Sequence, residues 1–219
     1  MIATSTGDSE APYTLAIVAM GPSHRDYLSE CIAASGRHRV ADETWAVNAM
    51  AGIIQHDRAI IMDALPYFAK AAKEHRHLDG YRDWLHAHPG PIYTQRAYEG
   101  FPGSVPYPLE DVLNTVRYPY FNTTVAYAVA LAIHLKVRHL KLYGMDFTNN
   151  DNRGFAEAGR ACLEYWLCDA IHRGIKVTIA PSSTLCDQSI GRRLYGYSTP
   201  PVITSDQAGR ISVALPQSV

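Results

Sequence analysis

The sequence has few cysteines, no excess of charge of one sign and no long apolar run, and each absence excludes a class of protein. Its cysteines are Cys31, Cys162, Cys168 and Cys186, and no two of them form a C-x-x-C pair. We therefore expect neither a zinc site nor a disulfide framework. The net charge of −1 gives no general basic surface for nucleic acid. No apolar run reaches the roughly 18 residues that a membrane-spanning helix needs.

The rest of the composition is that of a soluble globular protein. The chain has 219 residues, of which 47% are hydrophobic and 19% charged, enough for one large domain with its own core. We predict a single domain over residues 1–219, with an ordered core over about 12–190 and a C-terminal arm or hairpin over 191–219. Residues 1–12 are small and polar and lack the pattern of a signal peptide, so a cytoplasmic location is expected. The short chain is typical of a bacterial or phage gene.

Apolar, strand-like runs alternate with helix-compatible segments along the chain. The predicted strands cover residues 13–20, 44–48, 59–63, a segment that begins at 90, 138–145 and 175–179. The predicted helices cover residues 24–35, 64–76, 122–135 and 155–173, and a small hairpin or an exchanged arm follows over 201–215. Residues 99–121 are rich in proline, glycine and aromatics, which favours a structured functional loop or a poorly ordered lid. This alternation predicts an α/β fold, a Rossmann-like and mainly parallel sheet with helices on both faces.

Polar groups follow most of the predicted strands at the point where each strand ends. Because ligands bind beyond the carboxyl ends of parallel strands, these groups are expected to share one edge of the sheet. They are Gly21, Pro22, Ser23, Asn48, Asp63, Asp146, Ser182 and Ser183.

Two predicted helices begin with residues that suit a phosphate. The turn Gly21–Ser23 comes between a strand and a helix, and Thr123 and Thr124 open the apolar helix after the N-cap candidate Asn122. Free backbone N–H groups and the helix dipole favour an anion at such starts. An ordinary turn and simple helix capping are the alternative interpretations.

Carboxylates and one histidine near these helix starts are further candidates. Asp63 and Asp146 each close a strand, where a carboxylate holds a ribose hydroxyl or a magnesium ion, or else caps the next helix. His24 begins the first helix and is a candidate base or phosphate ligand, or a surface histidine.

An ordered series of these segments resembles a known family. It comprises Gly21–Ser23, Trp45–Asn48, the Thr123/Thr124 helix start, Tyr143–Phe147 and Pro181–Leu185. The series is similar to bacterial lipooligosaccharide sialyltransferases of Rossmann-like fold, and also to motility accessory factor and hydroxymethylpterin pyrophosphokinase-like proteins. The resemblance implies that a CMP-sugar binds, and that the nucleotide site is lined by Gly21, Ser23, Asn48, Thr123, Thr124 and Gly144.

The chain departs from the sialyltransferase pattern at three places. Met20 and Asp63 stand where that family has asparagines, and the loop over residues 147–157 lacks the family's catalytic histidine. A base in this loop would be Asp151 or Glu157. Arg153 is placed to neutralise a phosphate leaving group.

The sequence therefore predicts a nucleotide-binding transferase, a glycosyltransferase that uses a nucleotide-activated sugar donor. Two alternatives stay open. One is a magnesium-dependent pyrophosphokinase or phosphoryl transferase with Asp63 as metal ligand, and the other is a catalytically inactive nucleotide-binding protein. The expected partners are a nucleotide or nucleotide-sugar, a small-molecule or glycan acceptor, a modified nucleic acid if the gene is from a phage, and a second copy in a homo-oligomer.

Overall fold

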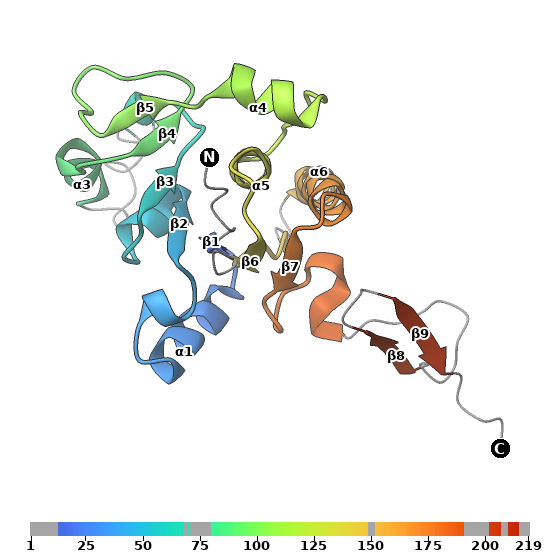
Figure 1. Cartoon of the computed structure of the whole chain (residues 1–219). Helices are drawn as coiled ribbons and strands as arrows, with labels where there is room; N and C mark the ends of the chain where they lie inside the picture. The colour runs from blue at the N-terminus through green and yellow to red at the C-terminus, as the bar shows by residue number, and fades with distance from the viewer. Residues whose placement is uncertain are drawn as a thin grey trace, which may run out of the picture.

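A seven-stranded parallel sheet forms the centre of the molecule (Figure 1). The computed structural model describes residues 13–67, 70, 80–148, 152–190, 202–206 and 210–214. The strand order is β5-β4-β3-β2-β1-β6-β7, and every neighbouring pair is parallel. The strands are β1 (Thr14–Val18), β2 (Glu43–Val47), β3 (Arg58–Ile60), β4 (Ile92–Thr94), β5 (Ser104–Pro106), β6 (His139–Tyr143) and β7 (Lys176–Ile179). The predicted α/β class is thus confirmed.

Strand β1 lies inside the sheet between β2 and β6, and its side chains serve both faces. Leu15 and Ile17 belong to one apolar core, and Ala16 and Val18 belong to the other. Such a continuous apolar run is typical of a strand that is covered on both sides. The chain builds β2 to β5 on one side of β1 and then returns to place β6 on the other. This reversal creates a switch point, where doubly wound folds bind their ligands.

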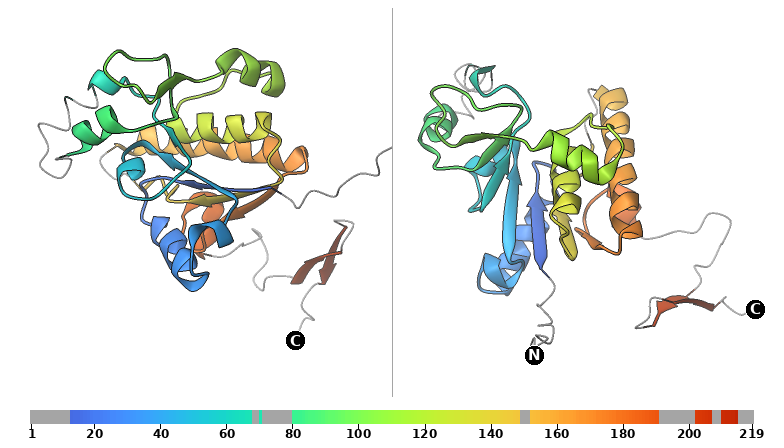
Figure 2. Two further views of the ribbon diagram at one scale, coloured as in Figure 1. Left: turned by 60° about the vertical axis from the view of Figure 1, so that its left-hand side comes forward. Right: turned by 45° about the horizontal axis from the view of Figure 1, so that its top comes forward.

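Helices cover both faces of the sheet. One face carries α4 (Leu109–Val116), α5 (Thr124–His134) and α6 (Arg153–His172), and the other carries α1 (His24–Ala33) and α3 (Tyr81–Ala87). Figure 2 shows α5 and α6 running side by side, with α1 across the sheet from them. Three short 3-10 segments complete the described core: η1 (Arg37–Arg39), η2 (Asn48–Gly52) and η5 (Leu185–Ile190).

The segment 99–121 is more regular than the sequence predicts. It contains β5, which pairs with β4 at the sheet edge, and α4, which begins directly after Pro108. Each is short, so its apolar pattern is too brief to stand out from the surrounding prolines and aromatics. Helix α3 is likewise absent from the predicted elements. Of the predicted helix over 64–76, residues 65–67 and 70 are helical, residue 64 is not, and 68, 69 and 71–76 lie outside the described residues.

The described C-terminal residues form a separate two-stranded sheet. Strands β8 (Val202–Ser205) and β9 (Ile211–Ala214) pair antiparallel. Within the part of the chain that the structure describes, no helix combines the length and the apolar character needed to cross a bilayer.

Candidate functional site

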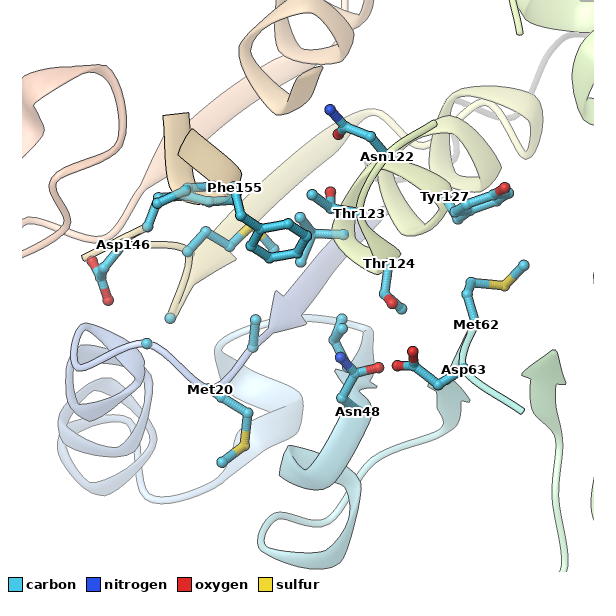
Figure 3. A pocket seen from close by; sticks show the side chains of 18 of the residues that line it. Met20, Asn48, Met62, Asp63, Asn122, Thr123, Thr124, Tyr127, Asp146 and Phe155 are labelled. Carbon is cyan, nitrogen blue, oxygen red and sulfur yellow. The ribbon is translucent and has the colours of Figure 1, made fainter. Parts of the chain in front are cut away.

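A pocket of about 760 Å³ lies at the carboxyl ends of β1, β2, β3 and β6, under the first turns of α5 and α6 (Figure 3). Because four strands end here, residues far apart in the sequence meet in one cavity. Its described lining is Ala19–Gly21, Val47, Asn48, Met62, Asp63, Gln95, Phe121–Val125, Tyr127, Gly144–Thr148, Phe155 and Ala156. Of the polar groups predicted to share this edge of the sheet, Gly21, Asn48, Asp63 and Asp146 line the cavity, and Thr123, Thr124 and Gly144 lie beside them in its wall.

The start of α1 is already occupied by a carboxylate of the protein itself, that of Asp146. The Asp146 carboxylate is 3% exposed and accepts the backbone N–H of Ser23 at 2.8 Å and that of Thr184 at 3.3 Å. The Ser23 hydroxyl in turn accepts the N–H of Gly144 at 2.9 Å. The prediction that Ser23 binds a ligand phosphate is corrected, because its polar groups are buried and bonded internally. Pro22 does not line the pocket either.

Two glycines allow this packing. Gly144 has a φ of 71°, and a Cβ there would collide with the carbonyl oxygen of Ala19. A Cβ at Gly21 would collide with the Asp146 carboxylate. Both positions therefore need glycine so that the ends of β1 and β6 can approach each other.

The start of α5 is open to the pocket. Thr123, and not Asn122, is the N-cap: its hydroxyl accepts the N–H of Ala126 at 3.3 Å, whereas the Asn122 amide donates to the Ala158 carbonyl at 3.0 Å. Thr124 and Val125 lie in the first turn, where backbone N–H groups have no partner within the helix. Figure 3 shows the Thr124 side chain directed into the cavity. This helix start supplies N–H groups, a hydroxyl and the positive end of the helix dipole.

Acceptor atoms gather on the opposite wall. Asn48 follows β2 in a left-handed conformation with a φ of 53°, and its Oδ1 is buried without a hydrogen-bond partner among the described residues. Figure 3 shows the Asn48 amide and the Asp63 carboxylate turned toward each other. Leaving a buried acceptor unsatisfied costs about 1–3 kcal/mol, so native structures reserve such groups for a ligand or another specific purpose. A ligand with N–H or O–H groups would satisfy this wall.

An aromatic wall joins the start of α5 to the wall formed by Asn48 and Asp63, and the sequence analysis does not predict it. Phe121 stacks on Tyr127, with ring centroids 4.6 Å apart, and on Trp166 at 4.9 Å. Burial raises the pKa of the Tyr127 hydroxyl. The sequence places Tyr127 inside an apolar helix, which indicates core. Its position three residues after Thr124, on the same helical face, is the signal that could have identified it.

Several predicted site residues do not reach the pocket. The His24 ring donates to the Gly21 carbonyl at 2.8 Å, and Arg153 and Glu157 are exposed on α6 outside the lining. Ser182 donates from its N–H and its hydroxyl to Asp26, both at 2.8 Å. The buried Ser183 hydroxyl bonds the Met145 carbonyl and the N–H of Leu185. Asp151 lies outside the described residues.

The pocket wall is poor in charge. Within the described lining, the carboxylates are those of Asp63 and Asp146, and no lysine, arginine or histidine contributes. Asp146 is used by the fold, which leaves Asp63 as the accessible charge. No group of three histidine, cysteine, aspartate or glutamate side chains suited to a metal ion occurs among the described residues.

Three solved structures to which the chain is similar are sialyltransferases. The sialyltransferase CstII from Campylobacter jejuni in complex with the substrate analogue CMP-3FNeuAc is 16% identical, with a TM-score of 0.47 and coverage of 94% of this chain and 95% of that chain. The sialyltransferase CST-II in complex with a trisaccharide acceptor and CMP is 16% identical, with a TM-score of 0.46 and coverage of 94% and 96%. The CstII complex with cytidine-5'-monophosphate is 17% identical, with a TM-score of 0.45 and coverage of 90% and 96%.

No family model and no curated protein matches the sequence. The resemblance to motility accessory factor and pyrophosphokinase-like proteins stays a prediction.

Proposed function

We propose that this chain is a glycosyltransferase and that a nucleotide-activated sugar binds in the pocket. The observation that carries the proposal is the pairing of two complementary walls across one cavity. The open start of α5 suits an anion, while the unpaired Asn48 Oδ1 and the Asp63 carboxylate suit hydrogen-bond donors. A nucleotide has both kinds of group. The motif resemblance makes a CMP-sugar the first donor to test.

The donor phosphate belongs at the start of α5. Backbone N–H groups of the first helical turn and the Thr124 hydroxyl would hold it, as helix starts hold phosphates in other folds. Since the described lining has no cationic side chain, these dipoles carry the stabilisation of the negative charge. The same groups would stabilise the charge that develops on the phosphate as the sugar leaves.

The nucleoside belongs against Asn48, Asp63 and the aromatic wall. A carboxylate at the end of a strand holds ribose hydroxyls in other doubly wound folds, and Asp63 would do the same in this pocket. Asn48 Oδ1 would accept a hydrogen bond from a ligand O–H or N–H. Tyr127 and Met62 add an apolar surface beside them.

The acceptor hydroxyl needs a base. Asp151 remains the candidate for it, because in the sequence it comes two positions before Arg153, the first residue of α6, and the proton would pass from the attacking hydroxyl to its carboxylate. The pocket is a poor binding site for a magnesium ion, because among the described lining residues the accessible carboxylate is that of Asp63.

The test is a ligand screen on two matched variants. Thermal unfolding would be followed with CMP, CMP-sialic acid, UDP and GDP, each with and without magnesium. A ligand at 100 times its Kd stabilises the protein by about 2.7 kcal/mol. Asn48→Gly removes the amide without straining a left-handed backbone, which alanine would do at a cost of about 1–2 kcal/mol. Asn114→Ala removes an exposed asparagine on α4 as the control.

We expect a cytidine nucleotide to shift the wild type and the control, and Asn48→Gly to need at least tenfold more ligand. Release of CMP from CMP-sialic acid in the presence of a glycan acceptor would then establish transfer. Absence of any shift with all four nucleotides would refute the proposal, as would equal affinity in Asn48→Gly.

A further inference from the structure

The C-terminal hairpin, which consists of β8 and β9, has two different faces. Its register pairs Ile203 with Val213 and Val202 with Ala214. Because paired residues share a face and neighbours along a strand alternate, Ile203, Ile211 and Val213 form one apolar face. Their side chains are 50%, 70% and 56% exposed. Figures 1 and 2 show the hairpin apart from the seven-stranded sheet, so this apolar face has no cover within the described part of the chain.

Such a hairpin needs a partner. Two strands with no third strand and no helix against them are marginally stable at best in water. The described side chains over 202–204 and 211–214 are all exposed. A partner that stabilises the hairpin must therefore offer backbone hydrogen bonds along one edge and apolar side chains against one face.

Strand β7 ends the main sheet and leaves its outer edge open. The backbone N–H groups of Lys176 and Ala180 donate to carbonyls on the β6 side, at 2.9 Å each. Because backbone groups alternate in direction along a strand, those of Val177 and Ile179 point away from β6. No strand among the described residues pairs with β7 on that side. The edge thus presents unpaired donors and acceptors to an added strand.

The opposite end of the sheet is closed to such an addition. In β5 the N–H of Tyr107 donates toward β4, to the Thr94 carbonyl at 2.7 Å, so Ser104 and Pro106 face outward. Ser104 already donates its N–H to the Phe101 carbonyl at 2.9 Å, and proline has no N–H. Of the two ends of the sheet, β7 is therefore the one that can accept another strand.

An apolar strip borders the open edge of β7 on the α6 side. The side chains of Val177 and Ile179 are partly buried against the core that contains α6. Glu164 on α6 accepts the backbone N–H of Cys186, beyond the end of β7, at 3.2 Å, so this side of α6 faces the edge. Ile171 lies about two turns further along the same side and is 57% exposed. A strand added here would find apolar side chains beneath α6.

We propose that the open edge of β7 binds the C-terminal hairpin of a second copy of this chain. The hairpin pairs with the backbone groups of Val177 and Ile179 and lays its apolar face toward Ile171. Backbone pairing and alternate side-chain contacts are the two components of binding by strand addition. This inference goes beyond the proposed function and does not depend on nucleotide binding.

The second copy is the occupant because a single chain leaves both halves of the contact uncovered. Residues 191–201 separate η5 from β8. A stretch of that length spans at most about 36 Å when fully extended, enough to reach a neighbouring molecule. Exchange about a two-fold axis is reciprocal, so one dimer covers two hairpins and two open edges.

The first test changes the two faces of the hairpin separately. Ile203→Thr/Val213→Thr makes the apolar face polar and keeps β-branched residues in both strands. Val202→Thr/Ala214→Thr is the matched control, because it changes the neighbouring cross-strand pair on the other face. Light scattering over a concentration series gives the mass of the full-length chain and of each variant, and circular dichroism checks that each variant is folded.

The second test addresses the edge that receives the hairpin. Ile171→Ser alters the apolar strip, and Ile32→Ser is its control, since Ile32 is 80% exposed on α1, across the sheet. Hydrogen exchange resolved by residue follows the amides of Val177 and Ile179, which are free in one chain and bonded in the proposed dimer.

We expect the wild type to form a concentration-dependent dimer. Ile203→Thr/Val213→Thr and Ile171→Ser should each raise its dissociation constant by about tenfold or more, and both controls should leave it unchanged. The amides of Val177 and Ile179 should exchange slowly in the dimer and fast in the hairpin variant.

Four results would overturn the inference. The wild type is monomeric at every concentration, the dimer survives Ile203→Thr/Val213→Thr, Ile171→Ser dimerises as the wild type does, or the β7 amides exchange fast in the dimer. A monomer with protected β7 amides would assign the edge to the hairpin of the same chain. A monomer that binds phosphatidylglycerol vesicles only with an intact apolar face would assign that face to a lipid surface. Either outcome removes the second copy as the partner.

Discussion

Replacing Asp146 by asparagine should unfold the protein at a markedly lower denaturant concentration. The carboxylate is buried and accepts backbone N–H groups from Ser23 and Thr184. Hydrogen bonds to a charged group contribute about 1.5–3 kcal/mol each. Asp146→Asn keeps the shape but turns one acceptor into an NH₂ group that faces an N–H donor. One bond is lost and one buried donor is left unpaired, so we expect a loss of about 2–4 kcal/mol.

Asp63→Asn is the matched control, because it makes the same chemical change at the end of a neighbouring strand. Asp63 is exposed in the pocket, so its free energy of unfolding should change by less than about 0.5 kcal/mol. Urea unfolding followed by circular dichroism measures both variants, and nucleotide titration follows on each. We expect Asp146→Asn to lose stability and Asp63→Asn to lose ligand affinity. If the two variants are equally stable, the internal role of Asp146 is wrong.

Two further predictions concern backbone packing and pH. Gly144→Ala should lower the free energy of unfolding by about 4 kcal/mol or more, because the strain of a left-handed backbone adds to the collision with the Ala19 carbonyl. Gly154→Ala is the control: its Cβ would meet nothing within 4 Å, so the urea midpoint should change little. Burial and the neighbouring His56 lower the pKa of His88 below its usual 6.5, and its Nδ1 accepts the N–H of Gly90 at 2.9 Å. His88 therefore binds fewer protons in the folded state than in the unfolded state. Its contribution to the free energy of unfolding is constant above about pH 6.5 and is lost as the pH falls through the lowered pKa. Unfolding in urea between pH 5 and pH 8 should show this loss in the wild type and a smaller one in His88→Phe, and an equal slope in both would contradict the assignment.

The parts of the fold that the sequence predicts are those with long local patterns. Strands β1 and β6 and helices α5 and α6 have apolar runs that reveal both type and position. Strand β5 spans Ser104–Pro106 only and depends on pairing with β4. Such an element is stabilised by tertiary contacts, which no short window of sequence contains.

The same distinction applies to the site. Thr123 and Thr124 can be predicted, because a cap followed by an apolar run is a local signal. The sequence alone misassigns Ser23 because its partner, Asp146, is 123 positions away in the chain. Tyr127 escapes prediction for a related reason: one side of an apolar helix faces the cavity only once the sheet edge has been assembled.

The Asp146 carboxylate at the start of α1 makes the two sides of the cavity electrostatically different. Three helix starts lie at this edge of the sheet, those of α1, α5 and α6, and that of α1 is already occupied by the Asp146 carboxylate. Under the proposed function, a phosphodiester at the start of α5 would have its nucleoside on the β2 and β3 side and its sugar near the first turn of α6. The Asp146 carboxylate thus removes the start of α1 as an alternative site for the negative charge of such a donor.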